Sequence, residues 1–295
     1  MPRRPSPAGG EAPEAGPSPE AGPPPEVGPP PRLATEQALR LLTEGEIELE
    51  GRLVEASNTT LRAFISLDEI TARCVYKPVR GERPLWDFPD GTLAGREVAA
   101  YLVSAGTGWD VVPPTVLREG PLGLGACQLW IDEPDDAVPL VGFVPVDTLP
   151  ADWLRVANAR GSDGRAYLLA HADDAALARL ALFDVVVNNA DRKGGHVLLD
   201  GAGHLYGVDH GVCFHTEDKL RTVLWGWVGR ALPDDCRADL TALRDALERG
   251  LGEELAGLLS PDEVATTVAR VQRLLDAGEF PEPGEGWPAV PWPPM

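Results

Sequence analysis

The sequence predicts a protein of the α+β class, with a small β-rich lobe followed by a larger, mainly helical lobe. Alternating apolar and polar residues, the pattern of half-buried strands, recur in the first half of the 295-residue chain, whereas helical periodicity dominates the second half. An acidic run at residues 132–136 separates the halves and indicates a linker. We therefore expect a β-rich lobe over residues 33–135 and a helical lobe over residues 136–279.

The small lobe is expected to be built mainly from short antiparallel strands. The alternation of apolar and polar residues predicts strands, and capping residues and glycines mark where helices begin and end. The predicted elements are a helix at 35–42, strands at 47–54, 61–67 and 72–77, a helix at 93–104, and strands at 111–117 and 125–131. A polar turn at residues 55–60 separates the first two strands. Tight turns between sequential strands favour antiparallel pairing.

The large lobe is expected to be loop-rich as far as about residue 164 and helical beyond it. Helices are predicted at residues 175–188, 234–249 and 261–277. Ser260 and Glu263 flank Pro261 with the spacing of a capping box, which marks the start of the last helix. Two short strands are expected on either side of the turn through Gly201 and Gly203.

Both ends of the chain are rich in proline. Residues 1–32 consist mostly of Pro, Gly, Ala and Glu and hold twelve of the thirty prolines. A segment of this composition cannot bury enough apolar surface to offset its ordering entropy, so we expect a disordered tail. Residues 280–295 form a similar C-terminal tail, in which Trp287 and Trp292 are available to pack on the body.

Composition narrows the classes of function. The formal net charge of -20 argues against a nucleic-acid partner, because phosphate backbones select basic surfaces. The four cysteines form no C-x-x-C pair, which favours reduced thiols in a cytoplasmic protein. No apolar run approaches the ~18 residues of a membrane span, although peripheral membrane contact stays open.

Lys77 and Glu97 suit a site for phosphate groups. Lys77 ends a predicted strand and Glu97 lies on the following helix, an arrangement in which an acid orients a cation toward phosphates. The alternative is that Lys77 is a solvated lysine and Glu97 a surface glutamate, because such pairs commonly have the same spacing. Ser57, Asn58 and Thr59 lie in the polar turn and could offer hydroxyl and backbone N–H groups to a phosphate, but an ordinary hairpin turn fits equally well.

Three aspartates are candidates for chemistry, two of them at or near the end of the helix at 175–188. Asp184 lies on its apolar face, where a carboxylate needs a partner, and is expected to hold the loop backbone or Arg192. Asp191 follows the helix and is placed to meet a substrate hydroxyl. Asp209 follows a short strand and precedes a turn, which suits a metal ion. The plainer interpretations are that Asp191 caps the helix and that Asp209 is an ordinary turn residue.

His196 has three interpretations: a metal ligand, a proton carrier or a packed ring. The five histidines form no H-x-x-x-H or H-E-x-x-H pair, which makes a zinc site a poor hypothesis. No G-x-S-x-G motif supports a hydrolase either.

Two motifs resemble those of a known enzyme family. Residues 183–192 read Phe-Asp-Val-Val-Val-Asn-Asn-Ala-Asp-Arg, which is similar to the catalytic loop of phosphatidylinositol 3-/4-kinases, most closely the type II phosphatidylinositol 4-kinases. Residues 208–214, Val-Asp-His-Gly-Val-Cys-Phe, resemble their metal-binding motif, and Arg221 and residues 225–227 resemble downstream positions. The likeness spans about 45 residues and suggests an actinobacterial-type branch that is also akin to HipA-like kinases.

The resemblance implies a two-lobed protein-kinase-like fold and transfer of the ATP γ-phosphate to a lipid or small-molecule hydroxyl. It implies these roles: Lys77 with Glu97 on the ATP phosphates, Asp191 with Arg192 in catalysis, Asp209 and His196 on Mg²⁺ or Mn²⁺, and Gln128, Trp130 and Ile131 near the adenine. His196 stands where related kinases have asparagine. A HipA-like kinase acting on proteins and a catalytically weak nucleotide-binding scaffold are the alternatives.

Overall fold

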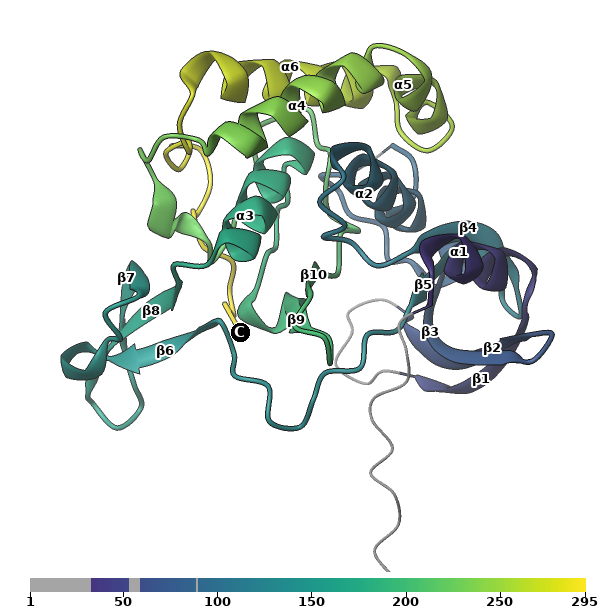
Figure 1. Ribbon diagram of the computed structural model, residues 1–295, viewed down its shortest axis with the longest axis horizontal. Helices are drawn as coiled ribbons and strands as arrows, with labels where there is room; N and C mark the ends of the chain where they lie inside the picture. The colour runs from purple at the N-terminus through teal and green to yellow at the C-terminus, as the bar shows by residue number, and fades with distance from the viewer. Residues whose placement is uncertain (1–32, 53–58, 89) are drawn as a thin grey trace, which may run out of the picture. The chain divides into compact units, whose positions relative to one another are not determined.

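The computed structural model describes residues 33–52, 59–88 and 90–295. The predicted N-terminal tail and two predicted phosphate-binding residues, Ser57 and Asn58, lie outside the described residues. The predicted α+β class is confirmed: an antiparallel sheet forms the N-terminal lobe, and helices dominate the C-terminal lobe (Figure 1).

The N-terminal lobe is a five-stranded antiparallel sheet with the strand order β1-β2-β3-β5-β4. Its strands are β1 (Glu46–Arg52), β2 (Leu61–Leu67), β3 (Ile70–Pro78), β4 (Thr115–Gly120) and β5 (Gly123–Leu129). Helix α1 (Thr35–Glu44) packs on β2, β4 and β5. Leu41 and Leu42 of this helix meet Ala63 and Ile65 of β2 in one apolar cluster, because alternate residues of a strand share a face.

The strand predicted at residues 111–117 begins only at Thr115. Pro113 and Pro114 precede it. Proline lacks the N–H that a ladder requires, so pairing with β5 starts after them.

Strand β3 and helix α2 (Leu93–Thr107) bring the predicted phosphate-binding pair together. Cys74 and Tyr76 of β3 are fully buried in the sheet, so Lys77 projects from the opposite face. Thr92 caps the start of α2, because its hydroxyl accepts a hydrogen bond from the backbone N–H of Gly95. This start places Glu97 about one turn into the helix.

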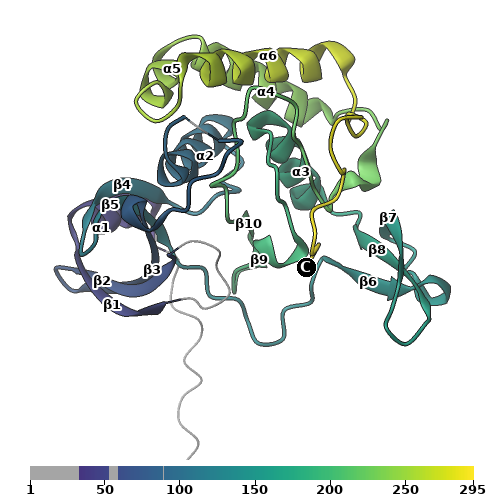
Figure 2. The ribbon, with the colours of Figure 1, turned by 180° about the vertical axis from the view of Figure 1, so that it is seen from behind.

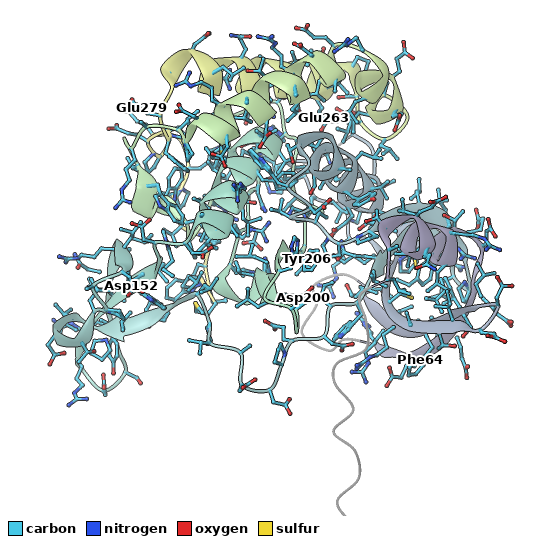
Figure 3. All side chains as sticks on the ribbon, viewed as in Figure 1. Phe64, Asp152, Asp200, Tyr206, Glu263 and Glu279 are labelled. Carbon is cyan, nitrogen blue, oxygen red and sulfur yellow. The ribbon has the colours of Figure 1, made fainter. Side chains whose placement is uncertain are left out.

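The C-terminal lobe packs around one central helix, α3 (Ala175–Val187). This helix is apolar on nearly all sides, and most of its residues are buried, as expected of a helix enclosed by others. Helices α4 (Asp234–Leu247), α5 (Gly250–Leu255) and α6 (Pro261–Ala277) complete the lobe, with α4 and α6 side by side (Figure 2). The predicted capping box is present at α6, where Ser260 and Glu263 bond reciprocally. Figure 3 labels Glu263 at the start of this helix.

The prediction of a loop-rich stretch up to residue 164 was wrong. This stretch and the residues after it form a three-stranded antiparallel sheet of β6 (Val141–Pro145), β7 (Trp153–Arg160) and β8 (Ala166–Ala172), in the order β6-β8-β7. A bulge between Arg155 and Ala157 shifts the alternation of β7, and β8 is buried at consecutive positions. Neither strand therefore has the strict two-residue period that reveals a half-buried strand.

Two short strands, β9 (Val197–Leu199) and β10 (Leu205–Gly207), pair on either side of the predicted turn. The C-terminal segment packs partly on the body: the Trp287 ring lies 4.6 Å from the Lys219 ammonium, whereas Trp292 is 87% exposed. The four cysteines are buried free thiols. No helix of the described residues has the length and apolar character needed to span a bilayer.

Candidate active site

Most of the charged residues predicted for chemistry line one small cavity of about 240 Å³. Its walls come from β3 and α2 of the N-terminal lobe and from the loops after α3 and β10 of the C-terminal lobe. The titratable side chains in these walls are Lys77, Glu82, Glu97, Asp191, Lys193, His196 and Asp209. Cations and carboxylates thus converge in a space large enough for part of a small molecule.

Lys77 is the cation at the centre of this cavity. Its Nζ contacts Oε1 of Glu97 and lies 3.0 Å from Oδ1 of Asp209. Burial lowers the pKa of Lys77, but the carboxylates of Asp209 and Glu97 outweigh burial and raise that pKa above its ordinary value. Lys77 therefore stays protonated at neutral pH, and the predicted pairing with Glu97 is present.

The loop after α3 is held by a fully buried ion pair. Arg192 donates from Nε to Oδ2 of Asp184 at 2.9 Å and from Nη2 to Oδ1 at 2.9 Å, and both side chains are 0% exposed. Asn189 Nδ2 also donates to Asp184 Oδ1 at 3.0 Å. The predicted structural role of Asp184 is confirmed: its carboxylate fixes both the loop and Arg192.

Arg192 also links the two loops that carry the acids. Its Nη1 donates to the carbonyl oxygen of Val208 at 2.8 Å, directly before Asp209. The guanidinium is completely buried and does not line the cavity. The guanidinium therefore joins the loops of Asp191 and Asp209 and does not face the cavity, and the predicted part of Arg192 in catalysis stays a prediction.

Asp191 faces the cavity between two cations. Its Oδ2 lies 2.9 Å from Nζ of Lys193, and its Oδ1 lies 3.8 Å from Nη2 of Arg221. Its backbone N–H donates to the side-chain oxygen of Asn189, which fixes the loop. Burial raises the pKa of Asp191, and the charges of Lys193 and Arg221 oppose that rise. A partly buried carboxylate of raised pKa is well suited to accept a proton.

Asp209 and His196 meet on the other side of the cavity. Oδ2 of Asp209 lies 3.6 Å from Nε2 of His196. The charge of Lys77 lowers the pKa of Asp209 and keeps its carboxylate ionised. Burial lowers the pKa of His196 to about 4, so its imidazole is neutral at physiological pH.

Asp209 and His196 are the residues of this cavity whose side chains would suit a metal ion. Within the described part of the chain, no three His, Cys, Asp or Glu side chains are grouped closely enough to hold a metal by themselves. Asp209 and His196 supply two donors, and Nδ1 of His196 is buried without a hydrogen-bond partner among the described residues. Mg²⁺ and similar cations commonly take one or two side-chain ligands and complete their shell with phosphates and water.

The residues predicted near the adenine do not line this cavity. Gln128 is buried, and its amide donates to the hydroxyl of Thr115 at 2.8 Å, so its side chain does not face the site. Trp130 packs against the guanidinium of Arg62. Trp130 and Ile131 directly follow β5, where the chain leaves the N-terminal lobe. Of the predicted phosphate turn, the described residue Thr59 does line the cavity.

Lys193 is the functional candidate that the sequence reasoning missed. The chain has three lysines, Lys77, Lys193 and Lys219, among its 26 basic residues. Two of these three line the cavity. Lysine is a compact, flexible point charge, unlike the planar fork of arginine. The scarcity of lysine elsewhere in the chain was a signal that could have identified Lys193.

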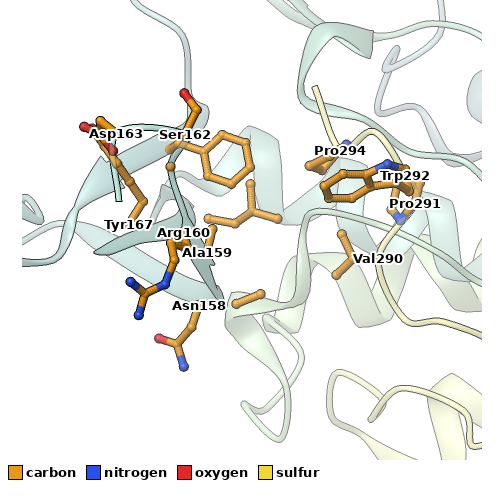
Figure 4. A pocket seen from close by; sticks show the side chains of 14 residues that line it. Asn158, Ala159, Arg160, Ser162, Asp163, Tyr167, Val290, Pro291, Trp292 and Pro294 are labelled. Atoms are coloured by element: carbon orange, nitrogen blue, oxygen red, sulfur yellow. The ribbon is translucent and has the colours of Figure 1, made fainter. Parts of the chain in front are cut away.

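A larger cavity of about 690 Å³ lies away from the charged site, between β7 and β8 and the C-terminal segment (Figure 4). Its lining is mainly apolar, with Tyr167 on one side and Trp292 on the other (Figure 4). Asp163, the one acid among its described lining residues, accepts hydrogen bonds from the Tyr167 hydroxyl and the Arg165 backbone. It lacks the convergent lysines and carboxylates of the smaller cavity, which is therefore the candidate active site.

The chain is similar to a mycobacterial protein and to two solved structures. No family model matches the chain. Protein Rv2133c of Mycobacterium tuberculosis is 49% identical over 261 residues, which cover 86% of this chain and 94% of that protein. Two solved structures are similar: the Golgi casein kinase with Mn/ADP bound (TM-score 0.49, 13% identity, 82% of this chain and 75% of that one) and the Helicobacter pylori proinflammatory kinase CtkA (TM-score 0.39, 9% identity, 81% and 94%).

Proposed function

The chain belongs to the same family as the mycobacterial protein Rv2133c, and we propose that it is an ATP-dependent phosphotransferase. The reaction would move the γ-phosphoryl group of ATP to a hydroxyl of a lipid or small molecule. The observation that carries this proposal is the convergence of Lys77, Glu97, Asp191 and Asp209 in one cavity, from elements up to 132 residues apart.

In this proposal Lys77 binds the ATP phosphates. The chain carries a net charge of -20, so a triphosphate needs a local cation to enter the site. Glu97 is 2% exposed and holds the Lys77 ammonium in place. A divalent cation bound with the nucleotide would be held by Asp209 and His196 and would neutralise charge on the phosphates.

Asp191 would take the proton of the acceptor hydroxyl. Its carboxylate is partly exposed in the cavity, so an acceptor can reach it. Lys193 contacts Oδ2 of Asp191, whereas Oδ1 lies near the more distant Arg221. Lys193 would thus orient the base and add positive charge where phosphoryl oxygens pass.

The choice of acceptor rests on the motif resemblance. The likeness of residues 183–192 and 208–214 to phosphatidylinositol 3-/4-kinases supports an alcohol acceptor, with an inositol lipid as the first to test. The acceptor panel should therefore contain phosphatidylinositol vesicles, free inositol and glycerol, and the protein itself. Label found only on protein would favour the HipA-like alternative.

Replacing Lys77 by methionine tests the proposed function. We expect ADP release from ATP, with Mg²⁺ or Mn²⁺ and the acceptor panel, to fall on the order of 10²-fold, because a charge preorganised for the phosphates is lost. Arg40→Met, on the exposed face of α1, is the matched loss of one cation and should keep wild-type activity. Equal ADP release by wild type and Lys77→Met would refute the assignment.

The pairing of Lys193 with Asp191 predicts a shift in pH dependence. A carboxylate must be ionised to accept a proton, so kcat falls as the pH falls through its pKa. Lys193 lowers the pKa of Asp191, and therefore Lys193→Met should raise that pKa and move the acid limb of the kcat profile to higher pH. Lys193→Arg keeps the positive charge, so the acid limb of its kcat profile should lie close to that of the wild type. An identical limb in all three proteins would contradict the pairing.

A further inference from the structure

His196 and Asp209 present a nitrogen donor and an oxygen donor to the same space. They come from different segments: His196 ends the short 3-10 turn η3 (Gly194–His196), and Asp209 follows β10. Both side chains line the active-site cavity, with Nε2 of His196 3.6 Å from Oδ2 of Asp209. This separation is too long for a hydrogen bond, so direct bonding to Asp209 does not explain the position of the ring.

Backbone hydrogen bonds connect the two segments that carry His196 and Asp209. The N–H of Val208 donates to the carbonyl oxygen of His196 at 3.0 Å, and Arg192 Nη1 reaches the carbonyl oxygens of both residues. The imidazole is 17% exposed, and its Nδ1 is buried without a hydrogen-bond partner in the described part of the chain. The backbone of His196 is therefore held close to that of Asp209, while Nδ1 of the ring makes no hydrogen bond within the described residues.

A mixed imidazole and carboxylate pair discriminates among divalent cations. Mg²⁺ is a hard cation that prefers oxygen ligands and loses water reluctantly. First-row transition cations accept imidazole nitrogen more readily, with affinity rising from Mn²⁺ toward Co²⁺ and beyond. An amide or carboxylate oxygen in place of the ring would remove this discrimination.

We propose that His196 makes the nucleotide-associated cation site select a first-row transition cation, such as Mn²⁺ or Co²⁺, over Mg²⁺. The ring binds the cation through Nε2, on the same side of the cavity as the Asp209 carboxylate. The inference rests on the proposed function in one respect: the rest of the cation's shell is completed by nucleotide phosphates and water.

The test is a binding experiment on the full chain with MnCl₂ and ADP, which needs no turnover. Mn²⁺ electron paramagnetic resonance gives the affinity, competition with MgCl₂ gives the selectivity, and pulsed measurements detect coupling to a histidine nitrogen. We expect nitrogen coupling in the wild type and none in His196→Asn. Loss of a group that merely supports a metal ligand costs roughly 10–100-fold in affinity, so His196→Asn should weaken Mn²⁺ binding at least about tenfold and Mg²⁺ binding far less.

His204→Asn is the matched control, because His204 is a histidine of the same lobe whose Nε2 contacts the backbone of Asp110 outside the cavity. It should keep both the nitrogen coupling and the selectivity. His196→Gln serves as a second variant, and thermal unfolding shows whether each protein is folded.

The outcomes separate this inference from the proposed function. Binding of Mn²⁺ with ADP but without nitrogen coupling, or with unchanged selectivity in a folded His196→Asn, overturns the inference and leaves the phosphotransferase proposal intact. Failure of the folded wild type to bind ADP at all overturns both. Nitrogen coupling that also disappears in Asp209→Asn supports the shared site.

Discussion

Replacing Asp191 by asparagine is expected to lower kcat for phosphoryl transfer by about 10²–10⁴-fold, the usual contribution of a general base. Asparagine has nearly the same size but cannot accept the acceptor's proton. The backbone N–H of residue 191 still donates to Asn189, and the buried pair of Asp184 and Arg192 is untouched. The loop should therefore keep its conformation, and the affinity for ATP should remain close to that of the wild type.

Single-turnover transfer and ATP binding, measured separately, check this prediction. Asp147→Asn removes an exposed carboxylate from the same lobe, outside the cavity, and should behave as wild type in both measurements. If Asp191→Asn lowers ATP affinity as much as it lowers turnover, the residue acts in nucleotide binding and not as the base. If turnover is unchanged, another group accepts the proton.

Local patterns in the sequence were sufficient to predict the parts of the site that a single element carries. The strand alternation that buries Cys74 and Tyr76 also sets the direction of Lys77, and an acid on the apolar face of α3 needed a partner such as Arg192. These inferences depend on the periodicity of apolar residues and on the free-energy cost of an unpaired buried charge. Both can be evaluated from a short segment of sequence.

Features that depend on tertiary packing were not accessible in this way. Spacing alone does not reveal that Arg192 turns inward, or that Lys77 reaches Asp209, 132 residues away. The family resemblance implied a place near the adenine for Gln128, but its amide donates a hydrogen bond to Thr115 on the neighbouring strand. The sheet of β6, β7 and β8 was missed because a bulge and continuous burial remove the two-residue period.

Breaking the buried pair of Asp184 and Arg192 should have the largest effect on stability. Arg192→Met leaves the fully buried Asp184 carboxylate with one uncharged partner, Asn189. Removing one member of a buried pair typically costs about 3–5 kcal/mol, because the other charge remains desolvated. At about 2–4 °C per kcal/mol for a domain near this size, the melting temperature should fall by on the order of 10 °C.

A double-mutant cycle separates the ion pair from the positioning role of Arg192. In Asp184→Leu/Arg192→Met no unpaired charge is buried, so denaturant unfolding should show that much of the lost free energy returns. Arg40→Met breaks the exposed pairs of Arg40 with Glu44 and Asp68 and should change the free energy of unfolding by less than about 1 kcal/mol. A double variant as unstable as Arg192→Met would show that the buried charge is not the cause.

In Asp184→Leu/Arg192→Met the free energy of unfolding should recover, but phosphotransferase activity should stay low. The thioether that replaces the Arg192 guanidinium donates no hydrogen bond, so the carbonyl oxygens of Val208 and His196 lose the group that joins the loops of Asp191 and Asp209. A misplacement of about 1 Å between catalytic groups can cost on the order of 10²-fold in rate. A stable but nearly inactive double variant would thus identify Arg192 as a positioning residue, because a purely structural ion pair would restore stability and turnover together.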